Sequence, residues 1–314
     1  MSGMIERRTL LGAATASAVL PLPLTPPLRT EWRDAARGRT VPVLIRAPLH
    51  TDPAPLVLLS HGLGGSRNGL AYLGEALARS GYVAIHLQHP GSDTAIWQGA
   101  ADPRGAMAAA ALNVGAALAR LQDIGFALDR VTGQDTGLET GIGLRIDPGR
   151  IAIAGHSYGA WTVSHMLGER LPLGGLGLGL PDRRLRAGIA LSPIPPFGVA
   201  PEQAYRDMSA PILHVTGTQD RGMGVADWRA RTVGYRNAAA PGFLAVFEGA
   251  SHAAFAGEEI AGGYWNDPTY HARTAEVSRL FLDAVLRGST GARAALLGGA
   301  GLVPGDAYES KGLA

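Results

Sequence analysis

The sequence has 314 residues, of which 46% are hydrophobic and 17% are charged, and its formal net charge is +2 at pH 7. This much apolar material with so little charge excludes a disordered chain and predicts one globular, sheet-centred domain with a large core. The sequence holds no cysteine, which excludes disulfides, thiolate metal sites and a cysteine nucleophile, and it has no basic run interleaved with aromatics, so we expect no nucleic-acid partner.

The N-terminal residues 1–30 have the features of an export signal followed by a linker. Arg7 and Arg8 precede a mildly apolar, alanine-rich stretch at 10–20 that offers small residues for cleavage, which resembles a twin-arginine signal. The alternative is an ordinary amphipathic N-terminus. The proline-rich stretch 21–27 predicts an extended linker. We therefore expect a periplasmic or secreted protein, or a cytoplasmic one if the signal is not used. The mature form should have no membrane span, because no other apolar stretch is long enough.

Residues 31–290 alternate short β-branched runs with longer alanine-rich segments, which predicts a mostly parallel sheet with helices on both faces. The strands should be buried on both sides, because their hydrophobicity is nearly continuous. The glycine- and leucine-rich stretch 171–181 predicts a connector, and the residues beyond Gly288, chiefly 291–314, predict a loosely attached tail. In chain order the expected elements are strands at 41–46 and 56–60, a helix at 70–80, a strand at 82–87, a helix at 104–130, a strand at 150–154, a helix at 160–169, strands at 187–191 and 212–216, a helix at 225–238, a strand at 243–247 and a helix at 270–287.

The strongest motif is Gly155-His156-Ser157-Tyr158-Gly159, which follows a predicted strand and opens a predicted helix. This is the context of a G-x-S-x-G nucleophile elbow. A sharp turn there holds the serine in a strained conformation, and glycines on both flanks avoid collisions with the neighbouring strand and helix. The chain has 44 glycines, so the pattern alone can arise by chance. Its placement between strand and helix makes Ser157 the candidate nucleophile.

A serine hydroxyl needs a base to take its proton and a carboxylate to orient that base. In such folds both follow the serine, the acid before the histidine. Asp220 follows the predicted strand 212–216, and His252 follows the predicted strand 243–247. Both therefore project from the carboxyl edge of the sheet, as Ser157 does. We predict His252 as general base and Asp220 as its orienting acid.

Other residues remain as alternatives for the acid. Glu248 and Asp227 are weaker substitutes, and Asp220 could instead stabilise a turn. Three further histidines lie in or beside predicted strands, where packing or pocket roles are expected: His86, His89 and His214.

The oxyanion of a tetrahedral intermediate needs two backbone amides. Tyr158, directly after the nucleophile, is expected to supply one. The glycine-rich turn at 60–65 follows a buried strand, and we assign Leu63 as the second donor. The turn lacks the lysine of a phosphate-binding P-loop. His61 is expected to shape the turn and not to act as a second base.

Several segments together resemble a known family. The run PLVLLSHGLGGSRNGLAYLGEALARSGY from Pro55, the HPGSD at 89–93, the elbow GHSYGAW, the loop TGTQD and the turn EGASHAAF are similar to bacterial α/β-hydrolases described as predicted dienelactone hydrolases. These are related to platelet-activating-factor acetylhydrolase and to some polyester-hydrolysing esterases. The resemblance extends from about Trp32 to Leu286.

The resemblance implies an α/β-hydrolase fold with a mostly parallel central sheet. It also implies Ser157, Asp220 and His252 as a triad, the amides of Leu63 and Tyr158 as oxyanion hole, and neither metal nor organic cofactor. True dienelactone hydrolases use a cysteine at the elbow, which this chain lacks. A carboxylesterase acting on a small-molecule, lipid or polymer ester is the better expectation.

The substrate pocket is predicted only from closeness to the triad in sequence. Trp161, Phe197, Phe255 and Trp265 would form an apolar wall, and each could equally be a core residue. The alternative functions are a lipase or phospholipid acetylhydrolase, a polyester hydrolase, an amidase or peptidase with the same triad, and a non-catalytic binding protein of this fold. The sequence does not indicate the oligomeric state.

The export hypothesis predicts the outcome of changing Arg7→Lys and Arg8→Lys together. The precursor should stay full-length in the cytoplasm of a bacterium with a twin-arginine pathway, because lysine lacks the planar donors of the paired guanidinium groups. Cell fractionation and mass spectrometry of the N-terminus measure this. Wild-type protein that remains cytoplasmic with an intact N-terminus would contradict the hypothesis.

Overall fold

A computed structural model describes most of the chain. The predicted export signal at 1–20 lies outside the described residues, as does most of the predicted connector at 171–181. The described residues are 21–49, 53–133, 145–172, 179, 181–222, 224–260, 263–265 and 267–313.

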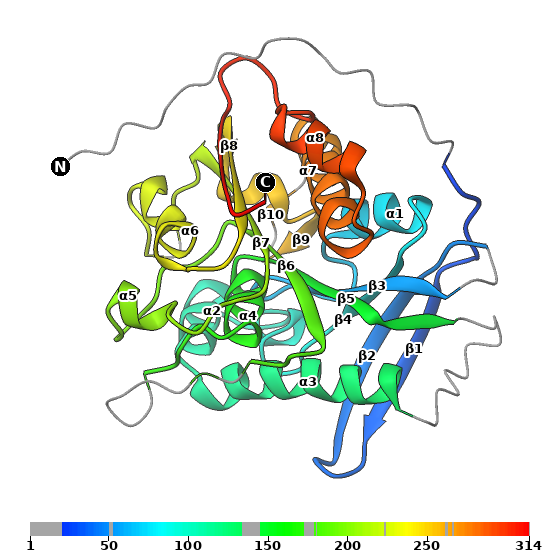
Figure 1. Cartoon of the computed structure of the whole chain (residues 1–314). Coiled ribbons are helices and arrows are strands. Elements are labelled where there is room, and N and C mark those ends of the chain that lie inside the picture. The colour runs from blue at the N-terminus through cyan, green and yellow to red at the C-terminus, as the bar shows by residue number, and fades with distance from the viewer. Residues whose placement is uncertain are drawn as a thin grey trace.

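A central sheet organises the described residues (Figure 1). Its strands are β1 (Leu28–Asp34), β2 (Arg39–Arg46), β3 (Ala54–Ser60), β4 (Val83–Leu87), β5 (Ile146–His156), β6 (Leu185–Leu191), β7 (Ile212–Gln219), β8 (Gly242–Ser251) and β11 (Ala307–Lys311). They lie in the order β1-β2-β4-β3-β5-β6-β7-β8-β11. The six strands from β4 to β8 in this order are parallel, whereas β1, β2 and β11 are antiparallel to their neighbours. Two short strands, β9 (Glu258–Ile260) and β10 (Gly263–Trp265), pair with each other.

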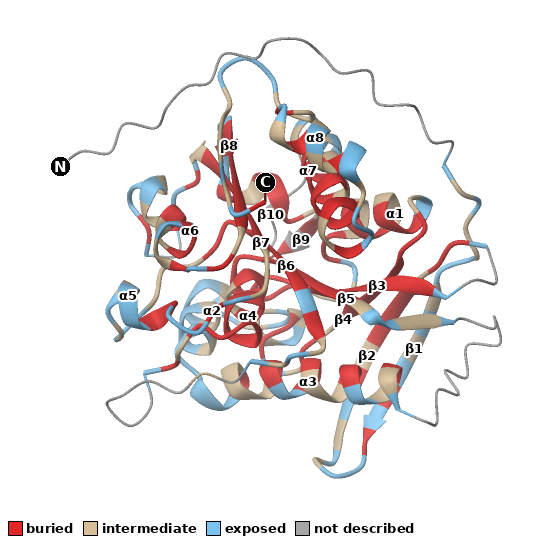
Figure 2. Cartoon of the chain, viewed as in Figure 1, coloured by how far each residue is buried: buried red, intermediate tan, exposed pale blue. Residues whose placement is uncertain are grey.

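Helices cover both faces of the sheet, as Figure 1 shows. The helices are α1 (Ala71–Arg79), α2 (Pro103–Ala111), α3 (Val114–Thr132), α4 (Tyr158–Met166), α5 (Pro201–Ala204), α6 (Val233–Asn237), α7 (Pro268–Leu286) and α8 (Thr290–Leu297). One core cluster joins the sheet to α3 and α4, and a second joins it to α1, α7 and α8. Strands β3 and β4 are buried along their whole length, and β5 to β8 are buried over most of the part that pairs in the centre of the sheet (Figure 2). No helix of the described residues is long and apolar enough to cross a membrane.

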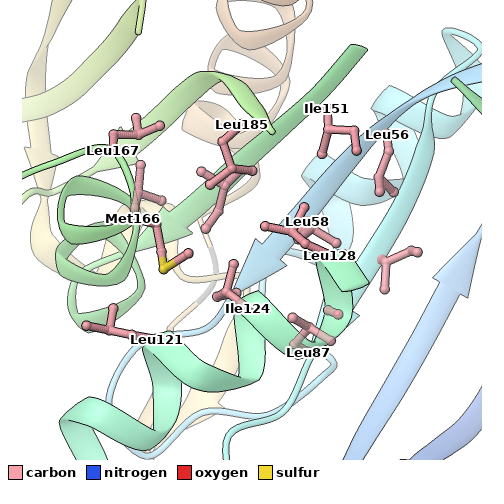
Figure 3. Close-up of a cluster of buried hydrophobic side chains, with 14 of the residues drawn as sticks. Leu56, Leu58, Leu87, Leu121, Ile124, Leu128, Ile151, Met166, Leu167 and Leu185 are labelled. Atoms are coloured by element: carbon pink, nitrogen blue, oxygen red, sulfur yellow. The ribbon is translucent and has the colours of Figure 1, made fainter. Parts of the chain in front are cut away.

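Helix α3 shows how the sequence pattern produces one of these faces. Its apolar residues recur at helical spacing, and Ile124 and Leu128 lie beside Leu58 of β3 in the core (Figure 3), whereas Leu121 lies farther along the helix in the same core cluster. A stripe at this spacing lies on one side of a helix and must be covered. The sheet face covers it here, which fixes α3 against the strands that lead to the candidate site.

The order of the strands places a switch point between β3 and β5. The chain runs from β3 through α1 to β4 on one side, and β5 then pairs on the other side of β3. Ligands of open α/β sheets bind where the strand order reverses in this way, at the carboxyl ends of the strands. The turn after β3 and the elbow after β5 are therefore neighbours.

Two predicted helices differ from the observed ones. The expected helix at 104–130 is broken into α2 and α3 at Asn113, whose side chain accepts a hydrogen bond from the Ala116 amide at 3.0 Å and begins the second helix. Asparagine favours such caps over helix interiors because its side chain competes for backbone donors. The expected helix at 225–238 is a 3₁₀ helix, Trp228–Thr232, followed by the short α6.

The N-terminal boundary of the body also differs from the expectation. Strand β1 begins before the predicted start of the domain at 31. The proline-rich segment before it is held against the body, because the amides of Leu22 and Thr25 donate to the carbonyls of Arg79 and Ala47. The predicted linker is therefore part of the packed structure.

The prediction of a loosely attached C-terminal tail is wrong. Strand β11 pairs with β8 at the edge of the sheet, and the ring of Tyr308 stacks on Phe243 with centroids 5.5 Å apart. Leu296 of α8 is only 1% exposed and belongs to the core. Glycine and alanine enrichment suggested looseness, but long-range pairing and burial order this segment.

Leu296→Ala is expected to lower the free energy of unfolding by about 2–5 kcal/mol, because it leaves a cavity in a packed core. Leu112→Ala is the matched control. Leu112 is 83% exposed, and its truncation should change the free energy by less than about 0.5 kcal/mol. Urea unfolding followed by circular dichroism compares the two. If both substitutions change the free energy of unfolding by the same small amount, the C-terminal residues are loosely attached after all.

Candidate active site

The turn at Ser157 places its side chain at the carboxyl end of β5. Ser157 has φ 55° and ψ −113°, a strained conformation for a residue with a side chain. A Cβ at Gly159 would lie 1.9 Å from the Ser60 carbonyl oxygen, and one at Gly155 would lie 2.3 Å from the Gly159 carbonyl. Only glycine fits at both flanks, because Gly159 contacts the end of β3 and Gly155 contacts the backbone of Gly159 across the turn.

The structure brings together the three residues predicted as nucleophile, base and acid. Ser157 Oγ lies 2.9 Å from Nε2 of His252, and Nδ1 of His252 lies 2.8 Å from Oδ1 of Asp220. All three side chains are largely buried. Nδ1–H of the imidazole donates to the carboxylate, which leaves Nε2 to accept the serine hydroxyl proton.

Asp220 is held by more than His252. The Thr216 hydroxyl donates to Oδ2 at 2.8 Å, and Arg231 forms a buried ion pair with Oδ1 at 2.7 Å. Burial alone would raise the pKa of the Asp220 carboxyl, but the hydrogen bond from His252 and the charges of His252 and Arg231 outweigh it and lower the pKa. Asp220 is therefore ionised at neutral pH. Arg231 also donates to the carbonyls of Asp220, Ser192, Pro193 and Gly222, so it fixes the whole acid loop.

A second histidine braces the base. The Nε2–H of His156 donates to the carbonyl oxygen of His252 at 2.9 Å, and the two rings lie 4.9 Å apart. Burial, together with the charge of His252, lowers the pKa of His156 to about 3. His156 is thus neutral and serves as a fixed donor.

The glycine-rich turn after β3 lies against the nucleophile. A Cβ at Gly62 would lie 3.7 Å from Cβ of Ser157. Tyr158 is the first residue of α4, so its amide has no intrahelical acceptor. Within the part of the chain that the structure describes, the amides of Leu63 and Tyr158 donate to no protein group. These two free amides, one in the residue after Ser157 and one in the residue after Gly62, are the candidate donors for an oxyanion.

Glu258 anchors the far part of this turn. Its Oε2 accepts the Ser66 amide at 2.8 Å, and a Cβ at Gly65 or Gly69 would lie 2.2 or 2.3 Å from its Oε1. Burial raises the pKa of Glu258 to about 8, so the carboxyl is protonated at neutral pH. It connects the segment after His252 to the turn after β3.

The residues predicted to line the pocket lie in different environments. Trp161 is partly buried between the rings of Tyr158 and His165. Phe197 is 88% exposed, and Phe255 is fully buried in the core beside Phe247. The backbone of Trp265 lies in β10, but its side chain lies outside the described residues.

The sequence analysis did not find Arg231, Glu258 or the buried Arg120 of α3. A signal existed for Arg120, because it lies at the spacing of the apolar stripe of α3, where a charge is unexpected. Arg231 and Glu258 lie in short irregular segments and have no such pattern.

Comparison with known proteins supports the fold described above. Residues 34–110 match the family described as platelet-activating factor acetylhydrolase, isoform II. No curated protein matches the sequence. Among solved structures, the chain is similar to a ferulic acid esterase from Streptomyces cinnamoneus, with a TM-score of 0.57 and 22% identity over 88% of this chain and 93% of that chain. The chain has the α/β-hydrolase fold.

This α/β-hydrolase fold confirms the predicted fold class and the resemblance to proteins like platelet-activating-factor acetylhydrolase. The segment matched by the family includes the turn with Leu63 and ends before Ser157. The family match therefore does not cover the elbow, the acid loop or the histidine turn, and only the contacts of these residues in the structure support their proposed roles.

Asp220→Asn is expected to lower ester hydrolysis by about 10⁴-fold, because an amide does not hold the imidazole in the required tautomer. Glu248→Gln and Asp227→Asn are the matched controls, since both side chains are exposed. Kinetics on a p-nitrophenyl ester compare the three. A fully active Asp220→Asn beside an inactive control would reassign the acid.

Proposed function

We propose that this chain is a serine-dependent carboxylic ester hydrolase. The observation that supports this most directly is the continuous hydrogen-bonded array from Ser157, which follows β5 at the switch point of the sheet, through His252 to the buried Asp220.

In the proposed reaction Ser157 Oγ attacks the ester carbonyl carbon while its proton passes to Nε2 of His252. The carbonyl oxygen gains the negative charge, and the amides of Leu63 and Tyr158 stabilise it. The bond to the alcohol oxygen then breaks, and His252 gives its proton to that oxygen. An acyl-enzyme remains on Ser157.

Water completes the cycle. His252 takes a proton from a water molecule, which attacks the acyl carbonyl carbon and releases the carboxylic acid, and Ser157 regains its hydrogen from His252. Asp220 stays ionised throughout and stabilises the imidazolium, a role supported by the lowered pKa of its carboxyl.

A more specific candidate is an acetylhydrolase acting on a phospholipid. The match of 34–110 to the platelet-activating factor acetylhydrolase family favours it. A panel of p-nitrophenyl acetate, butyrate and octanoate, platelet-activating factor, a feruloyl ester and a polyester film separates these substrate classes. An acetyl phospholipid turned over faster than the other esters would establish the candidate, and no turnover of it would exclude it.

Ser157→Ala is expected to abolish hydrolysis, with a loss on the order of 10⁶-fold in turnover, as in the protease in which the equivalent serine was removed. The fold should persist, because the hydroxyl contributes little packing. A fluorophosphonate probe should label the wild type and not the variant. Undiminished labelling of Ser157→Ala would move the nucleophile to another residue.

A further inference from the structure

Arg120 is a fully buried arginine in α3 that contacts both sides of the candidate oxyanion hole. Its Nε donates to Oγ1 of Thr162 at 3.1 Å, and one terminal nitrogen donates to Oγ of Ser92 at 2.8 Å. The other terminal nitrogen donates to Oγ of Ser60 at 2.9 Å and to the carbonyl oxygen of His61.

The acceptors of Arg120 are all neutral. Among the described residues none of its hydrogen bonds goes to a carboxylate. Burial lowers the pKa of Arg120 to about 10, so the guanidinium remains charged at neutral pH. A buried charge that is not directly paired costs stability. Stability alone therefore does not explain this residue.

Three of the four groups that accept from Arg120 belong to the two segments that carry the free amides, and the fourth is Ser92 of the loop after β4. Ser60 and His61 begin the turn of Leu63. Thr162 lies one turn into α4 and donates its own hydroxyl hydrogen to the Tyr158 carbonyl at 3.0 Å. The guanidinium carbon also lies 4.6 Å from the centroid of the Tyr158 ring.

His61, which Arg120 holds, orients the peptide that carries the Leu63 amide. Its Nε2 accepts the backbone N–H of His89 at 3.0 Å, so Nδ1 carries the hydrogen and donates to the Gly62 carbonyl at 2.6 Å. In a trans peptide the carbonyl and the following N–H point in opposite directions. Because the Gly62 carbonyl is directed at the His61 ring, the Leu63 N–H is directed away from it.

A further array holds Ser60 in place. Its hydroxyl accepts from Arg120, so its hydrogen is directed to Nε2 of His89 at 3.0 Å, and Nδ1–H of His89 donates to Asp123 at 3.1 Å. This array has the composition of a second triad, but Ser60 is fully buried. Burial lowers the pKa of His89 to about 4, so the ring is neutral and is a fixed member of the network.

We propose that Arg120 is a positioning residue of the oxyanion hole, which ties the turn at 60–63 to the start of α4 so that the amides of Leu63 and Tyr158 converge on one oxygen. Its charge lies behind these donors and adds to the positive potential at the oxyanion. The inference rests on the proposed serine hydrolase function and extends it.

The test compares Arg120→Met and Arg120→Lys with the wild type in two assays: the second-order rate of fluorophosphonate labelling at Ser157, and kcat and KM for p-nitrophenyl butyrate. Arg120→Met should lower the labelling rate and kcat by about 10- to 100-fold. This fall is no larger than the one caused by removing one direct donor of an oxyanion hole. KM should change by less than about threefold. Arg120→Lys should regain part of the rate, since it keeps the charge without the planar donors.

Tyr82→Phe is the matched control for loss of a buried polar contact. The Tyr82 hydroxyl donates to Asp283 at 2.7 Å. This contact lies at the amino ends of the parallel strands, whereas the candidate site lies at their carboxyl ends. This variant should lose stability and keep the wild-type labelling rate and kcat. A fall in kcat and labelling for Tyr82→Phe as large as that for Arg120→Met would overturn the proposal, since both would then reflect destabilisation.

A folded Arg120→Met with labelling and kcat within twofold of the wild type would overturn the proposal. If near-ultraviolet circular dichroism shows this variant unfolded, Thr162→Val takes its place, because it removes one acceptor at nearly constant shape, with Thr162→Ser as control. If Thr162→Val is labelled more slowly than Thr162→Ser, the proposal is supported. If the two variants are labelled at the same rate, the proposal is overturned. A wild type that is labelled but hydrolyses no ester refutes the proposed function, while the labelling comparison still tests Arg120.

Discussion

The close approach of the elbow at Ser157 to the end of β3 is the contact on which the site depends. The serine has positive φ, and Gly159 lies so near the Ser60 carbonyl that no side chain fits between them. This contact requires β3 and β5 to be neighbours in the sheet, which they are. It therefore brings the turn with Leu63 beside the nucleophile and makes one candidate site from two distant segments.

Two buried guanidinium groups hold the two halves of the candidate site. Arg231 lies behind the acid loop and pairs with Asp220, whereas Arg120 lies behind the turn and α4 and has neutral acceptors. A charge in a site with little water polarises its neighbours strongly and does not reorganise during a reaction. Burial also lowers the pKa of His61, His89 and His156, so these rings are neutral and act as fixed donors or acceptors.

The apolar framework gives these polar groups their fixed positions. Strands β3 to β8 are buried by helices on both faces, and β11 and β1 complete the two edges. The C-terminal residues are part of this framework, because β11 pairs with β8, the strand that leads to His252. Because a close-packed core resists deformation, it restricts the motion of the loops at the carboxyl edge that carry the candidate site.

The sequence by itself determined the alternation of strands and helices, the elbow and the order of Ser157, Asp220 and His252, because these follow from local periodicity, glycine placement and position after a strand. Tertiary structure decided the rest. Arg120 bonds residues 28 to 60 positions away, and Phe255, which was expected either in the pocket or in the core, is fully buried in the core. The tail forms an edge strand only through its pairing with β8. Such contacts depend on which segments meet in space, and no local pattern encodes that.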